Sequence, residues 1–167
     1  MSEQSEPTFS LSRVFAAPRA KVWRAYTELD ELSKWWGPKG FTWLRGTLEL
    51  KPGGMFHYGM RAPTGQEMWG KFVYREIRKP ERIVFTNSFS DASGGTVRAP
   101  FNPNWPLEVL NVVTFSEEGG KTRLSMTGSP FNPTPAEREA FDAMRTSMDQ
   151  GFKGTLDQLD EHLAAMG

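Results

Sequence analysis

The feature that most constrains the fold is a long amphipathic pattern that begins at residue 134. Thr134, Pro135 and Glu137 form a capping-box pattern with proline at the first helical position. Apolar residues then recur at three- and four-residue steps, at Phe141, Met144, Met148, Phe152, Leu156, Leu159 and Leu163. This stripe predicts one long helix whose single apolar face packs on another layer. Gly151 and Gly154 lie inside it and predict close approach to another backbone, or a bend.

The other layer is predicted to be a β-sheet. Short runs typical of strands, separated by turns that contain Gly and Pro, occupy residues 8–16, 41–50, 55–62, 66–77, 82–89, 107–117 and 121–128. Their short connections favour antiparallel pairing of successive strands. Between the first and second strands, Val22, Trp23 and Tyr26 and then Leu29 and Leu32 have helical spacing. This spacing predicts two short helices.

The predicted order of elements gives an α+β fold in which a curved antiparallel sheet wraps around the C-terminal helix. A strongly curved sheet leaves space between itself and a helix, so a cavity is expected there. Residues 8–167 are predicted to form a single domain, which is long enough to bury a sizeable core. The polar residues 1–7 are predicted to be a disordered segment.

Composition excludes several classes of function. The 20 basic and 20 acidic residues balance to a net charge of zero, and the basic residues form no run, which argues against a nucleic-acid partner. No apolar stretch approaches the length of a membrane span or a signal-peptide core, so a cytoplasmic protein without membrane insertion is expected. Cysteine is absent, and His57 and His162 lack metal-ligand spacing, so no metal site or cofactor is predicted.

A cluster of rings lies at the junction between the second short helix and the next strand. The run WWGPKGFTW places Trp35, Trp36, Phe41 and Trp43 around a Gly-Pro-Lys-Gly turn. Aromatic residues make up 13% of the sequence, so rings have to form much of the interior. The cluster is therefore either part of an ordinary aromatic core or the wall of a ligand cavity, and the sequence leaves both open.

Other candidates for the cavity wall are expected on the faces of the strands and the C-terminal helix that are directed toward each other. They are Phe56, Tyr58, Met60, Phe72, Phe85 and Phe89 on the strands, and Phe141, Met144, Met148 and Phe152 on the helix. Asn87 and Asn111 alternate with apolar residues, so each is a candidate polar anchor for a ligand. His57 should face the opposite side of the sheet from Tyr58. For each ring alone, a plain core role is the alternative.

The segment 90–106 is long for a loop in a compact domain. It presents Phe101 and Trp105 among several prolines, and these rings are expected to form a lid over the cavity or, alternatively, to cap one end of the core. Glu67, Glu76 and Glu108 could each act as a general base if buried. Nothing in the sequence gives these carboxylates a partner, so no catalytic residue is assigned.

Several segments carry a resemblance to a known family, and together they cover nearly the whole sequence. They are VFAAPRAKVWRAYTELDELSKWWGPKGFT, KPGGMFHYGMRAPTG, GKFVYREIRKPERIVFTNSFSD, VVTFSEEGGKTRLSMTG and SMDQGFKGTLDQLDEHL. The chain resembles the START-like (SRPBCC) superfamily. Within it, the chain resembles homologues of the activator of the ninety-kilodalton heat-shock-protein ATPase, in a bacterial subgroup mostly without a demonstrated function. The resemblance implies the helix-grip fold and a deep, mostly apolar cavity between sheet and terminal helix.

Three hypotheses for function follow from the residues and the resemblance together. The first is a module, monomeric or homodimeric, that binds a small hydrophobic and ring-containing molecule such as a lipid, polyketide or aromatic metabolite. The second is an enzyme of the cyclase or hydrolase type acting on such a molecule, which requires a titratable residue inside the cavity. The third, implied by the family resemblance, is a protein partner of a chaperone ATPase, which requires no open cavity.

Overall fold

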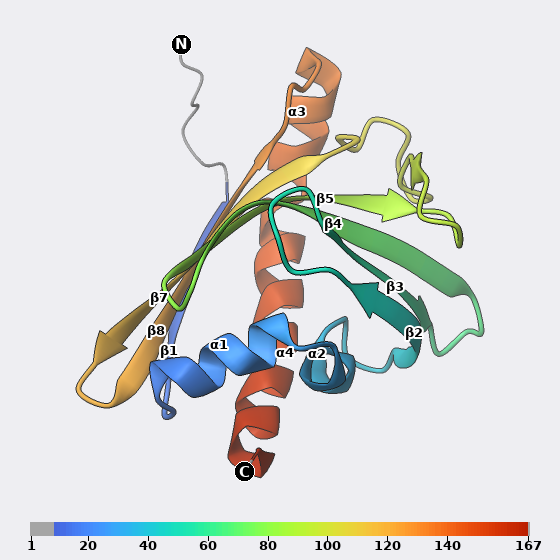
Figure 1. Cartoon of the computed structure of the whole chain (residues 1–167). Coiled ribbons are helices and arrows are strands. Elements are labelled where there is room, and N and C mark those ends of the chain that lie inside the picture. Colours follow the sequence, from blue (N-terminus) through green and yellow to red (C-terminus); the bar gives the residue numbers. More distant parts are fainter. Residues whose placement is uncertain (1–8, 167) are drawn as a thin grey trace.

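A computed structural model of the chain describes residues 9–166. The segment 1–7, predicted to be disordered, lies outside the described residues. The element order is one strand, two short helices, seven further strands and two C-terminal helices. The predicted α+β class and helix-grip architecture are confirmed: an antiparallel sheet curves around a long C-terminal helix (Figure 1).

The sheet is antiparallel throughout. Its strands are β1 (Phe9–Phe15), β2 (Thr42–Leu48), β3 (Met55–Arg61), β4 (Glu67–Arg78), β5 (Arg82–Ser90), β6 (Thr96–Val97), β7 (Val109–Glu118) and β8 (Lys121–Pro130). They pair in the order β1-β8-β7-β5-β4-β3-β2, and the short β6 pairs with the end of β5. Successive strands from β2 to β5 are neighbours, as their short turns predict. The strand β6 was not predicted, because two residues inside a loop carry no readable alternation.

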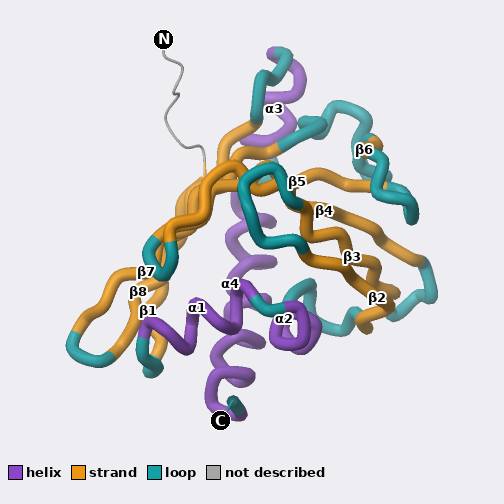
Figure 2. Tube along the Cα trace, viewed as in Figure 1, coloured by secondary structure: helices purple, strands orange, loops and turns teal. Residues whose placement is uncertain are grey.

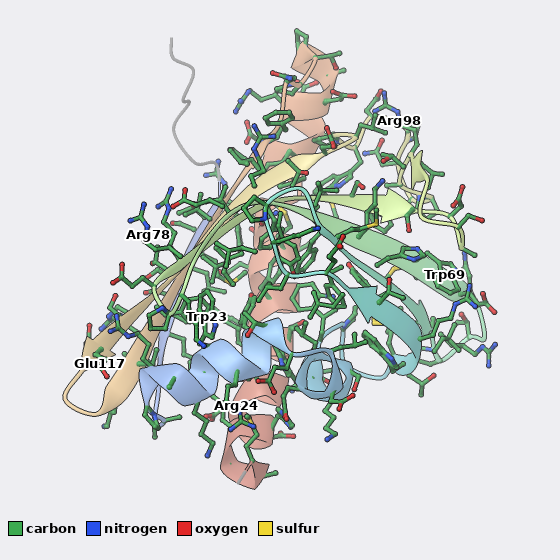
Figure 3. The ribbon with its side chains drawn as sticks, in the orientation of Figure 1. Trp23, Arg24, Trp69, Arg78, Arg98 and Glu117 are labelled. Carbon is green, nitrogen blue, oxygen red and sulfur yellow. The ribbon has the colours of Figure 1, made fainter. Side chains whose placement is uncertain are left out.

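The helices are α1 (Arg19–Thr27), α2 (Leu29–Trp35), α3 (Pro135–Ala143) and α4 (Arg145–Ala165). Figure 2 shows α4 running through the hollow of the sheet, with α1 and α2 crossing it. The helix α1 directs Trp23 toward the sheet, where its ring lies 5.3 Å from that of Phe115, whereas Arg24 lies on the other side of the helix (Figure 3). Together these helices and the sheet enclose the main core.

The single C-terminal helix predicted from the apolar stripe is in fact two helices. Met144 separates them with φ −97° and ψ 8°, and its N–H donates to the carbonyl of Phe141, one residue short of the α-helical interval. The two helices pack on different elements: α3 on β8, and α4 on β1, α1 and α2. The stripe is continuous in sequence, so the break follows from this packing and not from a local signal.

For Gly151 and Gly154 the sequence predicted close approach to another backbone, or a bend, and the close approach is not observed. A Cβ on Gly151 would have no described atom within 4 Å, and one on Gly154 would meet only the aliphatic part of Lys39. The reason is that α4 stands away from the middle of the sheet. Among the described elements, no Cα of α4 lies within 8 Å of a Cα of β3, β4 or β5.

Two groups of side chains fill the interior. The larger lies between the sheet and helices α1, α2 and α4 and includes Trp35, Phe56, Phe72 and Leu159. The smaller is centred on Phe9, Val109 and Phe141, near α3. Met148 and Phe152 of α4 pack against this second group, and Phe152 also packs against the first. The region between the two groups therefore lies beneath α4, where the helix is distant from the sheet.

Candidate functional site

Three adjoining cavities lie in the described structure, two of them between α4 and the sheet and the third at the end of the sheet where β4 begins. The first, here called the loop cavity, has a volume of about 250 Å³. Its walls come from the sheet, from the loop between β6 and β7, and from helices α3 and α4. The lining residues are Phe9, Asn87, Phe89, Phe101, Trp105, Val109, Asn111, Gly128, Phe141, Met144, Ser147, Met148 and Phe152.

The second, the helix cavity, lies farther along α4 and has a volume of about 200 Å³. It is lined by Trp36, Gly37, Pro38, Tyr58, Met60, Met68, Met148, Gly151, Phe152 and Thr155. Met148 and Phe152 belong to both walls, so the helix cavity and the loop cavity adjoin at these two side chains, which form part of the partition between them. Methionine is flexible, so this partition can move without a change in the backbone.

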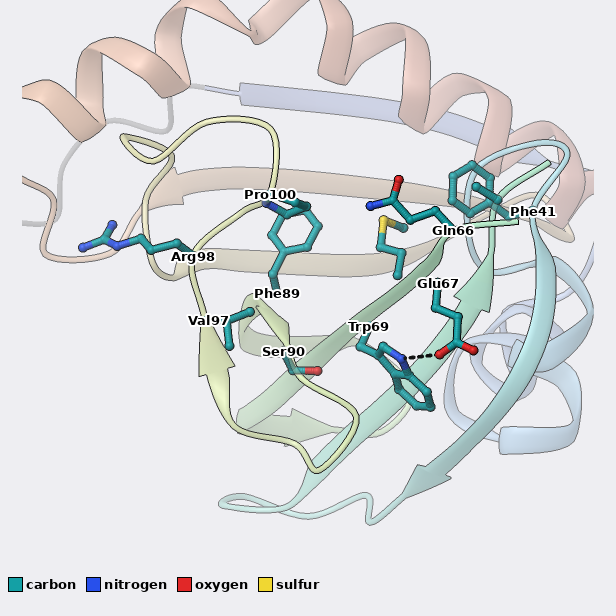
Figure 4. A pocket seen from close by; sticks show the side chains of 11 residues that line it. Phe41, Gln66, Glu67, Trp69, Phe89, Ser90, Val97, Arg98 and Pro100 are labelled. Carbon is teal, nitrogen blue, oxygen red and sulfur yellow. Dashed lines mark hydrogen bonds between the residues drawn. The ribbon is translucent and has the colours of Figure 1, made fainter. Parts of the chain in front are cut away.

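The third, the edge cavity, has a volume of about 320 Å³ and lies where β4 begins and β5 ends (Figure 4). Its wall comprises Phe41, Ala62, Gln66, Glu67, Met68, Trp69, Phe89, Ser90, Val97, Arg98 and Pro100. It shares Phe89 with the loop cavity and Met68 with the helix cavity. This cavity is the most polar of the three in its side chains, and Trp69 donates from Nε1 to a Glu67 carboxylate oxygen at 3.2 Å.

Most of the site residues predicted from the sequence line these cavities. In the loop cavity they are Asn87, Phe89, Phe101, Trp105, Asn111, Phe141, Met144, Met148 and Phe152; in the helix cavity Trp36, Tyr58 and Met60; and in the edge cavity Phe41. The structure thus brings together residues from several segments of the chain between Trp36 and Phe152. Binding of a ligand by these residues stays a prediction.

Five predicted residues do not line any of these three cavities: Trp35, Trp43, Phe56, Phe72 and Phe85. Trp35 is 1% exposed and donates from Nε1 to the carbonyl of Ala25 at 2.9 Å. Phe72 and Phe85 stack with their centroids 4.0 Å apart. These rings fill the core and not the cavity walls. Alternation along a strand predicts which face of the sheet a side chain is on, but not whether it then meets a cavity or other core side chains.

Several wall residues were missed by the sequence analysis. Met68 carried a usable signal, since it alternates with Gly70 and Phe72 on the inward face of β4. Gln66, Arg98 and Pro100 carried none, because they lie in loops whose position depends on tertiary contacts. Arg98 is an example: its Nη1 donates to the Trp105 carbonyl at 3.2 Å and to Glu137 at the start of α3.

The loop between β6 and β7 lies over the loop cavity. The ring of Phe101 lies 5.7 Å from that of Phe89, and the ring of Trp105 lies 5.2 Å from that of Phe141. The ion pair between Arg98 and Glu137 joins this loop to α3. Hydrogen bonds from Arg98 and from the backbone N–H of Thr134 hold the pKa of Glu137 below its ordinary value.

The polar groups of the two inner cavities are few and uncharged. Asn87 Nδ2 donates to the carbonyl of Lys71 and Asn111 Nδ2 to that of Val109, each at 3.1 Å. The hydroxyl of Tyr58 has a raised pKa because burial disfavours its ionised form. These three side chains are the candidate partners for a polar atom of a ligand.

The titratable residues considered earlier lie outside these two inner cavities. His57 is on the opposite side of the sheet from Tyr58, and its Nε2 lies 3.1 Å from the carbonyl oxygen of Asp91. Residues 9–166 contain no group of three or more His, Asp or Glu side chains placed to hold a metal ion. None of the described helices is long and apolar enough to cross a membrane.

Comparison with solved structures finds the same fold in several bacterial proteins. Protein Ms6760 from Mycobacterium smegmatis is 27% identical over 95% of this chain and 91% of its own, with a TM-score of 0.73. A protein from Arthrobacter aurescens is 24% identical over 95% of this chain and 86% of its own, with a TM-score of 0.75. One from Rhodobacter sphaeroides is 21% identical over 98% and 97%, with a TM-score of 0.74.

Comparison of sequences gives a family as well as a fold. A search of curated proteins finds no match. The family model described as "Activator of Hsp90 ATPase homolog 1-like protein" matches residues 16–164, which include every strand except β1 and all four helices apart from the last residue of α4. This match confirms the resemblance found in the sequence, and the fold is one that typically binds hydrophobic ligands. The chain therefore belongs to the family of proteins like the activator of Hsp90 ATPase homolog 1.

Proposed function

We propose that this protein binds a small, hydrophobic, ring-containing molecule between the sheet and α4. The observation that carries the proposal is the pair of inner cavities, which adjoin at Met148 and Phe152 and have mostly apolar walls without a charged side chain. Burial of about 150 Å² of apolar ligand surface would contribute about 4 kcal/mol before entropic losses. Walls rich in aromatic rings favour a flat ligand, whose faces they can stack on or meet edge-on.

The volumes of the two inner cavities limit the size of the ligand that each can hold. Each inner cavity is smaller than the range of about 300–1,000 Å³ that is usual for small-molecule sites. A ligand that displaces the side chains of Met148 and Phe152 would occupy both cavities at once. We therefore expect an elongated molecule, or a system of two or three rings, that binds with rotamer changes in these two residues.

An amide-resolved NMR titration tests the proposal. The panel contains flavonoids, aromatic polyketides, sterols and fatty acids. A ligand should give saturable shifts at Asn87, Phe89, Met148 and Phe152, and leave the outward-facing His57 unchanged. If no compound shifts these amides saturably, the proposed function is wrong for the classes in the panel.

A matched variant can show that binding occurs beneath α4. A Cβ on Gly151 meets open space, and Gly151 lines the helix cavity. Gly151→Phe should therefore fill that cavity and weaken binding at least tenfold. Gly154→Phe, one turn along the same helix but outside the walls of the three cavities, is the control and should leave the affinity unchanged. Equal affinity of both variants would contradict a site beneath α4.

A further inference from the structure

A cluster of polar side chains, formed by Tyr58, Trp36 and Asn87, lies where the two inner cavities adjoin. Tyr58 on β3 pairs with Gly70 on β4, which in turn pairs with Phe89 on β5. A Cβ on Gly70 would lie 2.6 Å from the Tyr58 hydroxyl oxygen, so the phenol crosses β4 only because this position has no side chain. The hydroxyl thereby reaches the inner face of the sheet near Asn87.

Two further donors lie beside this hydroxyl. Trp36 packs its ring edge-on against Tyr58 with centroids 6.1 Å apart, and its buried indole N–H interacts with the Tyr58 hydroxyl oxygen without the alignment of a full hydrogen bond. The amide of Asn87 also lies next to the hydroxyl while donating to the Lys71 carbonyl. Both neighbours favour the phenolate, but burial outweighs them and raises the pKa of Tyr58. The hydroxyl therefore keeps its proton.

The group consequently contains one donor, the O–H of Tyr58, for which the described residues supply no acceptor. The phenol of Tyr58 is 7% exposed and donates no hydrogen bond to any residue in the range 9–166. A buried donor without a partner costs free energy that a suitable ligand atom would recover. Trp36 and Tyr58 line the helix cavity and Asn87 lines the loop cavity, so a ligand that extends through both would pass these donors.

The absence of charged side chains from the walls of the two inner cavities indicates which kind of ligand atom can accept this hydrogen bond. No Lys, Arg, His, Asp or Glu lines the loop cavity or the helix cavity. A carboxylate buried there would lose its hydration without gaining a cation. A neutral carbonyl oxygen loses much less and can accept from two donors at once.

We propose that Tyr58 and Trp36, supported by Asn87, form a recognition site for a neutral carbonyl oxygen on the ring-containing ligand. This inference rests on the proposed function and deepens it. It predicts that ketones, quinones, lactones or esters of ring compounds are bound in preference to hydrocarbons and carboxylates of the same skeleton.

Titration calorimetry with three compounds of one skeleton tests the inference. The probes are 1-tetralone, which has the carbonyl; tetralin, which lacks it; and 1,2,3,4-tetrahydro-1-naphthoic acid, which carries a carboxylate at neutral pH. The wild-type protein should bind 1-tetralone about tenfold more tightly than tetralin, as expected for one or two recovered hydrogen bonds. The carboxylate should bind more weakly than the ketone.

Two matched variants assign the preference to the hydroxyl of Tyr58. Tyr58→Phe should remove most of the preference for the ketone while leaving tetralin affinity within twofold of wild type. Tyr74→Phe makes the same chemical change at a buried tyrosine on β4 outside the three cavities, and it should retain the full preference. Thermal unfolding of both variants checks that each is folded.

The outcomes separate the two proposals. If 1-tetralone and tetralin bind equally well, or if Tyr58→Phe keeps the full preference, the carbonyl site is wrong while cavity binding stands. If the carboxylate binds most tightly, the argument from neutral walls is overturned. If no probe binds to the wild-type protein, the proposed function fails for ring compounds of this size, and the carbonyl site fails with it.

Discussion

Trp35 and Trp36 are adjacent in sequence but have different roles. Trp35 lies in the core with its indole N–H bonded to the carbonyl of Ala25, whereas Trp36 lines the helix cavity and its N–H has only a poorly aligned interaction with the Tyr58 hydroxyl. Trp35→Phe should lower the free energy of unfolding by about 1–3 kcal/mol, because a hydrogen bond and a filled volume are lost. Trp36→Phe should cost less, because its N–H has only a poorly aligned interaction to lose. Urea denaturation of the two variants measures the difference.

The control for this comparison is ligand binding. Trp35→Phe should leave the affinity for a cavity ligand within twofold, since its ring is not in a cavity wall. A larger destabilisation by Trp36→Phe than by Trp35→Phe would contradict the assignment of the two roles.

These two residues also define how far the sequence can predict the site. The run WWGPKGFTW indicates a cluster of rings that is either core or cavity wall, and in the structure Trp35 and Trp43 pack in the core whereas Trp36 and Phe41 line cavities. Which ring faces a cavity depends on where α2 ends and how β2 approaches β3, and neither is encoded in a local pattern. The same limit applies to Phe72 and Phe89: both face inward, but one is in the core and the other in two cavity walls.

Two glycines should respond in opposite ways to alanine. Gly151→Ala should raise the free energy of unfolding by about 0.5–1 kcal/mol, because its Cβ meets open space in a helix interior. Gly70→Ala should destabilise the protein, because its Cβ would lie 2.6 Å from the Tyr58 hydroxyl. Urea denaturation measures both changes. Destabilisation by Gly151→Ala would mean that α4 lies closer to the sheet than the structure has it.

At the scale of elements, the sequence predicts regular structure well and connections poorly. The run 55–62 predicts β3 (Met55–Arg61), and the run 82–89 predicts β5 (Arg82–Ser90), because alternation and turn residues bracket each strand. The division between α3 and α4, and the position of the loop over the loop cavity, depend on tertiary contacts such as that between Arg98 and Glu137. No periodic signal reports such contacts.

The ion pair between Arg98 and Glu137 should make the attachment of this loop depend on pH. The folded-state pKa of Glu137 lies below its ordinary value of 4.5, chiefly because of the hydrogen bond from Arg98. This contribution to stability is therefore present above about pH 4.5 and is lost as the pH falls through the lower, folded-state pKa. Arg98→Met should reduce the acid-dependent loss of stability, measured by thermal unfolding across about pH 3–6.

The neighbouring Arg138 supplies the control for the ion pair. Within the described residues its side chain makes no ion pair with an acidic group, so Arg138→Met should leave the pH dependence as it is in the wild type. An unchanged pH profile in Arg98→Met would show that the ion pair does not hold the loop in solution.

At the scale of the whole molecule, the separation between α4 and the middle strands is the property that matters for function. The helix packs on β1, α1 and α2, and two cavities lie between it and the strands β3 and β5. The resemblance to the family implies this arrangement, but composition and periodicity alone do not. A stripe of apolar residues is compatible with a helix packed closely on the sheet and with one separated from it by a cavity. The stripe specifies which face of the helix is directed toward the sheet, but not the distance between helix and sheet.

The last prediction concerns the stability of the whole domain with a ligand bound. A molecule that binds only the folded state, at about 100 times its Kd, stabilises that state by about 2.7 kcal/mol. For a domain of this size, the midpoint of thermal unfolding should rise by about 5–10 °C. Gly151→Phe should lose this rise without a lower midpoint in the absence of ligand, because its ring fills space that is empty in the wild type. An equal rise in wild type and Gly151→Phe would place the ligand elsewhere on the molecule, and the cavities beneath α4 would then have to be assigned another role.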